Sequence, residues 1–123
     1  MRFSLDADHT KNLIRAYSQG SITVNERVID RSVVVMPERL IENWPPQSVA
    51  ELDASHFDGL QALQLEIVIL GTGAHHHFPH PRVTQPLLIQ GIGVEIMSTA
   101  AACRTYNIIM NEGRRVAAAL LMI

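Results

Sequence analysis

One stretch limits the possible folds more than any other: an apolar run that ends abruptly in glycine, histidine and proline. Residues 65–70 are almost all apolar, and Gly71-Thr72-Gly73-Ala74-His75-His76-His77-Phe78-Pro79 follows them directly. A short, continuous apolar run bounded by turn residues is typical of a strand that is covered on both faces. The sequence therefore predicts a buried strand that leads into a special loop.

The length and composition favour one globular domain. The chain has 123 residues, of which 47% are apolar and 18% charged. Most single domains have about 100 to 150 residues, and this apolar content is enough to form a core. We therefore expect residues 1–123 to form one domain. Residues 1 to about 20 fit either a loose arm, over residues 1–15, or a first edge strand.

The charges and the single cysteine restrict the partners and the compartment. The formal net charge is -2, and the ten basic residues are scattered along the sequence, which gives no electrostatic footprint for nucleic acid. Cys103 is the single cysteine, so an internal disulfide is excluded, and a chain with one cysteine suits a reducing compartment. The longest apolar run, Val116 to Ile123, is far shorter than the roughly 20 residues of a membrane-spanning helix. We expect a cytoplasmic protein without membrane insertion.

Short strands are predicted for the first third of the chain. Ile22-Thr23-Val24 and Arg27-Val28-Ile29 flank Asn25-Glu26, which is the pattern of a hairpin with a tight turn. Two further apolar runs, 32–36 and 40–44, each end at a proline, which cannot continue a paired strand. This part of the chain is therefore expected to be mostly β.

The remainder alternates between strands and helices. A short helix is expected around residues 55–63, where Phe57, Leu60 and Leu63 recur at intervals of three. Further helices are predicted over 82–90 and 99–112, and further strands over 94–97 and 116–123. Short links between alternating strands and helices favour a largely parallel α/β sheet with helices covering it.

Several segments, in their order along the chain, are similar to a known family of small domains. The most specific are Ala101 to Asn107 and Glu112 to Val116, and the similarity covers about residues 16–123. The other segments are Arg31-Ser32 with the following valines and Pro37, Asn43-Trp44-Pro45-Pro46, Ile69 to Gly73 with Phe78-Pro79, and Gly91 to Met97. The chain resembles the bacterial branch of the Mth-type family, which includes mitochondrial complex I assembly factor 3 and the adipogenesis-associated Mth-type domain protein.

The resemblance implies a three-layer α/β fold with a mixed central sheet, in which some strands run antiparallel. It also implies a non-enzymatic role in protein binding, because the mitochondrial relatives bind other proteins during respiratory-complex assembly and no reaction is established for the fold. His75-His76-His77 departs from the family pattern, since bacterial relatives more usually carry arginine and glutamine there.

The loop Gly71-Thr72-Gly73 is the first candidate site. Two glycines after a strand let backbone amides approach a small anion closely. The loop lacks the third glycine of a dinucleotide-binding fingerprint and the lysine of a P-loop. Turn geometry that needs positive φ is therefore the competing interpretation.

The neighbouring histidines suggest a metal site. In an extended loop, His75 and His77 would point the same way and could share a zinc or nickel ion, while His76 points away. The default interpretation is a solvated polar loop, so we expect no physiological metal and no cofactor.

Acid–base catalysis by Glu66 and Glu95 is a further option, although pairing of these carboxylates with Arg104 or Arg114 is the simpler interpretation. Cys103 falls on the apolar stripe of the 99–112 helix and is predicted to be core.

We expect a non-enzymatic domain that binds another protein through the loop and an exposed helix face. The alternative is a small-ligand or anion-binding protein, or an unrecognised enzyme, that uses the Gly71–Gly73 loop. Arg104 and Asn107 share a polar helix face, which is either solvated surface or a pocket wall beside the loop. The predicted contact residues are Gly71, Thr72, Gly73, His75, His77, Phe78, Arg104 and Asn107.

Overall fold

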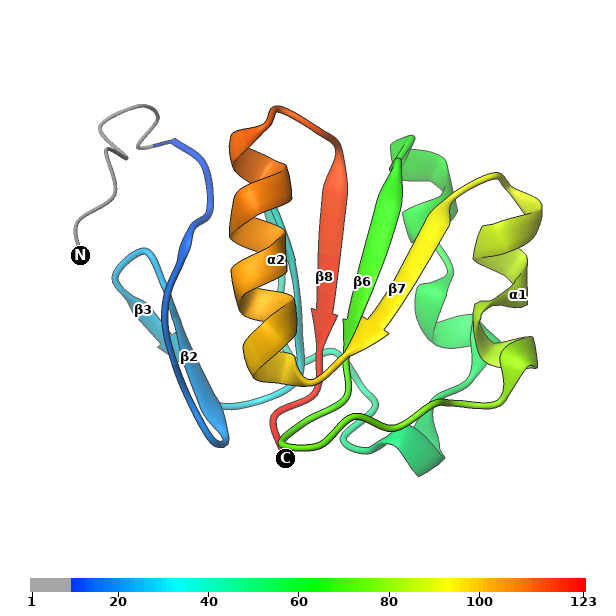
Figure 1. Cartoon of the computed structure of the whole chain (residues 1–123), viewed down its shortest axis with the longest axis horizontal. Helices are drawn as coiled ribbons and strands as arrows, with labels where there is room; N and C mark the ends of the chain where they lie inside the picture. The colour runs from blue at the N-terminus through cyan, green and yellow to red at the C-terminus, as the bar shows by residue number, and fades with distance from the viewer. Residues whose placement is uncertain (1–9) are drawn as a thin grey trace.

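A five-stranded sheet forms the centre of the molecule (Figure 1). The computed structural model describes residues 10–123. The strands of the large sheet lie in the order β5-β4-β8-β6-β7. Their bounds are Val33–Met36 (β4), Arg39–Ile41 (β5), Ile67–Gly71 (β6), Gly93–Met97 (β7) and Val116–Leu120 (β8).

The central sheet is mixed. β6 runs parallel to β7 and to β8, whereas β4 runs antiparallel to β8 and to β5. Only two residues, Pro37 and Glu38, separate β4 from β5, and so short a link permits only antiparallel pairing. The mixed sheet that the family resemblance implied is confirmed, while the largely parallel arrangement expected from spacing holds only for β8, β6 and β7.

A second, three-stranded antiparallel sheet comes from the N-terminal part of the chain. It contains β1 (Ile14–Ser18), β2 (Ser21–Val24) and β3 (Arg27–Ile29). The predicted hairpin is confirmed, with Asn25 in the turn at a φ of 54°. Of the two alternatives for the start of the chain, a loose arm or a first edge strand, the structure shows the edge strand over Ile14–Ser18. Residues 1–9 of the suggested arm lie outside the described residues.

The prediction of one helix around residues 55–63 is wrong. Three short 3₁₀ helices occupy this region: η2 (Val49–Glu51), η3 (Ala54–Phe57) and η4 (Leu60–Leu63). Gly59 interrupts them with a φ of 89°, which a continuous α-helix cannot contain. A repeat of three residues matches the three-residue turn of a 3₁₀ helix better than the 3.6-residue turn of an α-helix.

The two faces of the central sheet are covered by different elements. The helix α2 (Thr99–Asn111) and the three-stranded sheet share one core with one face, while α1 (Pro81–Ile89) and the 3₁₀ segments share another core with the opposite face. In Figure 1 the small sheet lies to the left of α2, and α1 lies to the right beyond β7. Val68, Ile69 and Leu70 of β6 have no exposed surface, which confirms the predicted strand buried on both faces.

No helix within residues 10–123 combines the length and the apolar character needed to cross a bilayer.

Candidate functional site

The Gly71–Gly73 loop follows the carboxyl end of β6 and is tightly packed. A Cβ atom on Gly71 would lie 2.9 Å from Leu120 Cδ2 and 3.0 Å from the Cα of Thr99. Gly73 has a φ of +96°, and a Cβ atom there would lie 2.5 Å from Cγ1 of Ile123. The glycines therefore let β6 pass close to the start of α2 and to the C-terminal residues.

The backbone amides of this loop point into the protein. The Thr72 N–H donates to the carbonyl of Met97 (2.9 Å), and the Ala74 N–H donates to the carbonyl of Ile123 (2.7 Å). The Gly73 N–H donates to Oγ1 of Thr99 at 2.8 Å. An anion cradle needs such amides to point at the ligand. The loop would have to break these three bonds to hold an anion in that way.

Two threonine hydroxyls fix the conformation of the loop. The Thr72 hydroxyl donates to the carbonyl of His75 (2.6 Å) and accepts the N–H of His77 (3.1 Å). The hydroxyl of Thr99, which sequence reasoning did not select, donates to the carbonyl of Leu121 at 2.7 Å. The only sign of this role in the sequence was that Thr99 directly follows Ser98, which caps α2. The loop is therefore rigidly connected to α2 and to the chain after β8.

The histidine side chains lie in solvent. His75 and His77 are exposed, with ring centroids 6.3 Å apart, and the His76 ring lies 4.5 Å from that of Phe78. His80 instead caps α1, where its Nδ1 accepts the N–H of Arg82 at 3.1 Å. Within residues 10–123 there is no group of three or more His, Cys, Asp or Glu side chains placed to hold a metal ion.

Asn107 does not join the loop in one pocket. Its Nδ2 donates to the carbonyl of Ile14 (2.7 Å) and its Oδ1 accepts the N–H of Ile14 (3.0 Å), so the side chain continues the bonding of β1. Asn107 lies eight residues after Thr99, or about 12 Å along the helix axis. Arg104 is exposed on α2. Of the two alternatives for Arg104 and Asn107, the shared pocket wall is therefore wrong: Asn107 attaches β1 to α2.

The environment of Cys103 makes it a poor nucleophile. The residue is 4% exposed, and desolvation raises the pKa of its thiol to about 12. This agrees with the prediction that Cys103 belongs to the core.

Glu66 pairs with arginine, as the simpler interpretation of this residue predicted. Its carboxylate accepts the backbone N–H of Arg115 (2.9 Å) and lies 3.5 Å from Nε of Arg114 and 3.8 Å from a terminal nitrogen of Arg115. The hydrogen bond from the Arg115 N–H, followed by the charges of the two arginines, lowers the pKa of Glu66. Glu95, on β7, is exposed. The two carboxylates therefore have separate surroundings.

A cleft of about 390 Å³ lies at the opposite end of the central sheet, near the amino ends of β6 and β8. It is bordered by the β4–β5 turn, by the residues before β6, and by the link from α2 to β8. Its lining residues are Lys11, Met36, Pro37, Glu38, Arg39, Leu63, Leu65, Met110, Gly113, Arg114, Arg115 and Val116. Sequence reasoning missed this site, because apart from the adjacent pair Arg114-Arg115 its basic residues come from distant segments.

Comparison with known proteins identifies the family. The sequence profile described as "Protein of unknown function (DUF498/DUF598)" matches residues 14–121. The chain belongs to the DUF498 family. This DUF498 chain is 32% identical, over 110 residues, to "NADH dehydrogenase (ubiquinone) 1 alpha subcomplex assembly factor 3" of Mus musculus. The match covers 88% of this chain and 59% of the assembly factor, so the chain spans less than two thirds of that relative.

Solved structures of similar bacterial proteins share the fold. A crystal structure from Bordetella parapertussis has a TM-score of 0.86 and 41% identity, and the match covers 93% of this chain and 98% of that one. A solution structure from Bordetella pertussis, described as a Mth938-like domain, has a TM-score of 0.83 and 35% identity over 99% of this chain and 92% of that one. The resemblance to the Mth-type family and the mixed α/β fold are thereby confirmed.

Proposed function

We propose that this chain is a non-enzymatic, cytoplasmic domain that binds another protein during the assembly of a larger complex. The observation that carries the proposal is the position of exposed apolar side chains. Among residues 10–123, three of the six large apolar side chains that are exposed fall within residues 78–89. They are Phe78 (75% exposed), Leu88 (55%) and Ile89 (73%). Exposed apolar side chains along this segment make it a candidate interaction surface.

Phe78 follows a stretch of backbone that hydrogen bonds fix, which suits an interface anchor. Thr72 bonds to the backbone of His75 and His77, and the His76 ring packs against Phe78. A side chain held in place before binding loses little conformational entropy when a partner covers it. Leu88 and Ile89 lie on the last turn of α1, which starts three residues after Phe78, so the exposed apolar side chains are spread along the helix from the loop to the link before β7. We call this region, residues 78–89 with the preceding histidines, the loop–α1 surface.

The family supports a polypeptide as the partner. The mammalian relative is named as an assembly factor, and the part that this chain matches includes the whole loop–α1 surface. The predicted contacts of His75, His77 and Phe78 belong to this surface. Gly71, Thr72 and Gly73 fix the backbone of the loop that precedes Phe78. Asn107 is bonded to Ile14 and is not part of this surface.

Site-specific photocrosslinking tests this proposal. A photoreactive phenylalanine analogue is placed at position 78 or 89 in cells that natively make the protein. The control position is 28, because Val28 is 70% exposed but lies on β3 of the other sheet. We expect one discrete adduct of the same mass from positions 78 and 89, identified by mass spectrometry, and none from position 28. Equal labelling at all three positions would contradict the proposal.

Substitution gives a second readout. Phe78→Ser combined with Ile89→Ser should abolish co-purification of the crosslinked partner, while the thermal midpoint stays close to wild type because both side chains are solvated. Arg104→Glu tests whether the exposed face of α2 contributes, as sequence reasoning expected. Retention of the partner by the double variant would place the interface elsewhere.

A further inference from the structure

The cleft at the amino ends of β6 and β8 combines an apolar floor with a basic rim. Met36 and Met110 are each 5% exposed, and Val116 is fully buried. Leu63 and Leu65 border the same space and are half-buried. Methionine side chains adapt to irregular apolar shapes, so this floor suits a hydrocarbon chain.

The rim concentrates positive charge in an acidic protein. Lys11, Arg39, Arg114 and Arg115 are four of the ten lysines and arginines in the chain, and all four line the cleft. Of the described residues, Glu38 is the one carboxylate in the lining, so the lining within residues 10–123 has a formal charge of +3, or +2 when the adjacent Glu66 is included. The whole chain has a formal charge of -2. The fold therefore gathers cations that are scattered in the sequence.

The arginines are positioned by the protein and keep donors for a ligand. Glu66 holds Arg114 through Nε and Arg115 through one terminal nitrogen, and the carbonyl of Gln64 accepts the Nε–H of Arg115. Each guanidinium carries five N–H groups, so donors remain on both side chains. The ion pairs are exposed to solvent and are therefore weak.

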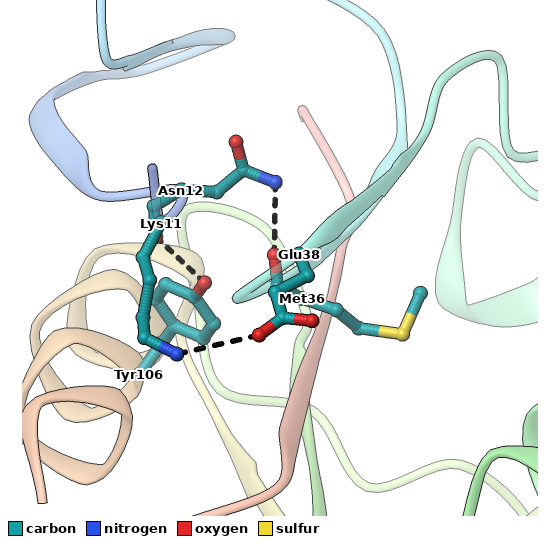
Figure 2. A network of polar contacts seen from close by, with 5 residues as sticks. All are labelled: Lys11, Asn12, Met36, Glu38 and Tyr106. Atoms are coloured by element: carbon teal, nitrogen blue, oxygen red, sulfur yellow. Dashed lines mark hydrogen bonds and ion pairs between the residues drawn. The ribbon is translucent and has the colours of Figure 1, made fainter. Parts of the chain in front are cut away.

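The opposite wall of the cleft is fixed by a polar network (Figure 2). Nδ2 of Asn12 donates to the carbonyl of Met36 (2.9 Å), and the Tyr106 hydroxyl donates to the carbonyl of Asn12 (2.7 Å). Nζ of Lys11 lies 3.5 Å from the Glu38 carboxylate. These contacts join the segment before β1 to the β4–β5 turn, so both walls are formed before any ligand arrives.

We propose that this cleft binds a small anionic amphiphile, with a carboxylate or phosphate group at Arg39, Arg114 and Arg115 and a short hydrocarbon chain against Leu63 and Leu65 and the accessible edges of Met36 and Met110. The volume of about 390 Å³ lies within the range of small-molecule sites, about 300 to 1,000 Å³. Among residues 10–123, no aromatic side chain lines the cleft to stack a base, which argues against a nucleotide. The cleft lies at the opposite end of β6 from the loop that follows this strand (Figure 1).

Titration followed by two-dimensional amide NMR tests this proposal on the full chain. The probes are octanoate and octyl phosphate, and the controls are acetate, inorganic phosphate and octyltrimethylammonium. We expect saturable shifts at the amides of Arg39, Leu65, Gly113 and Val116 with a dissociation constant below about 1 mM for at least one of the two probes. The tighter of the two probes identifies the charged group.

A matched pair of variants makes the result specific. Arg39→Gln should weaken binding about tenfold, because a charge-assisted hydrogen bond is lost. Arg82→Gln removes the same charge from α1 and should leave binding unchanged. The free spectrum of each variant shows that it is folded.

Several results would overturn the proposal. These are equal shifts from octyltrimethylammonium, equal affinity for acetate or inorganic phosphate, or identical binding by Arg39→Gln and wild type. Tighter binding of an acidic peptide at the same amides would likewise reject the small-ligand assignment.

Discussion

At the scale of single residues, close packing explains most of the unusual positions. Gly71 and Gly73 are glycines because a Cβ atom at either position would meet Thr99, Leu120 or Ile123. Thr99 is a buried polar residue, yet its hydroxyl both donates to Leu121 and accepts from Gly73. A buried hydroxyl that is satisfied in both directions stabilises the turn instead of weakening it.

Gly73→Ala should destabilise the protein by more than about 2 kcal/mol, since the new Cβ meets Ile123 and the backbone stays in the left-handed region. Gly91→Ala is the matched control. Gly91 has a φ of +79°, and a Cβ atom added there would meet nothing within 4 Å, so only the backbone cost of about 1 to 2 kcal/mol applies. Urea unfolding measures both variants, and equal losses would contradict the close contact with Ile123.

Cys103 should resist thiol reagents in the native protein. Its pKa of about 12 and its 4% exposure leave almost no accessible thiolate at pH 8. A chromogenic disulfide reagent is expected to react with one thiol per chain rapidly in denaturant, and at least about a hundredfold more slowly without it. Rapid reaction of the folded protein would show that the thiol is accessible.

At the scale of elements, α2 connects the two sheets. It packs on β6 and β8 within one core and is attached to the N-terminal segment by Asn107 and Tyr106. Asn107 supplies both a donor and an acceptor to Ile14, as a neighbouring strand would. The helix thus completes the edge of β1 as well as covering the central sheet.

Asn107→Ala should reduce the free energy of unfolding by about 1 to 3 kcal/mol, because both hydrogen bonds to Ile14 are lost. Hydrogen exchange of the β1 and β2 amides should accelerate more than that of β6. Asn107→Asp keeps the acceptor and loses the donor to the Ile14 carbonyl, so it should also be destabilised. Uniform acceleration in all strands would show that β1 does not open separately.

At the scale of the whole molecule, the two ends of the central sheet differ. The carboxyl end of β6 is closed by hydrogen bonds and leads into the exposed loop from which the loop–α1 surface extends along α1. The amino ends of β6 and β8 border the basic cleft, where Glu66 connects the start of β6 to the segment before β8. Parallel pairing of these strands brings Glu66 and the two arginines together.

Glu66→Gln should reveal this connection through pH. The pKa of Glu66 in the folded protein lies below its ordinary value of 4.5, so the ionised form favours folding. The stabilisation is present above the unfolded-state pKa and is lost as the pH falls through the folded-state pKa. Wild type should therefore exceed the variant in urea midpoint at pH 7, and the difference should shrink on acidification below about pH 4.5.

Glu26→Gln, on the exposed turn between β2 and β3, is the control and should change the midpoint little. A difference between wild type and Glu66→Gln that stays constant with pH would mean that the carboxylate charge does not act in this way.

Much of the fold could be predicted because it depends on local patterns. The hairpin around Asn25, the strand before Gly71 and the helix after Ser98 follow from turn residues, apolar runs and caps that lie close together in the sequence. The segment 55–63 differs from its prediction because three-residue spacing is shared by α- and 3₁₀ helices, and the interruption depends on the conformation of Gly59.

The candidate site could be predicted only in part. Sequence position placed His75, His77 and Phe78 on one loop, where the structure exposes them. It could not show that the amides of Thr72 and Gly73 are used by Met97 and Thr99, since those partners are 25 and 26 residues away. Binding by these residues stays a prediction.

By itself the sequence determined most of the elements, their order and the buried character of β6 and β8, because these depend on periodicity and turn chemistry within a few residues. Only the tertiary structure decided that β4 pairs antiparallel with β8, that Asn107 bonds to Ile14, and that Arg39, Arg114 and Arg115 line one cleft. Such pairings depend on which distant segments the chain brings together, and the charge on one segment gives no sign of its neighbours in space.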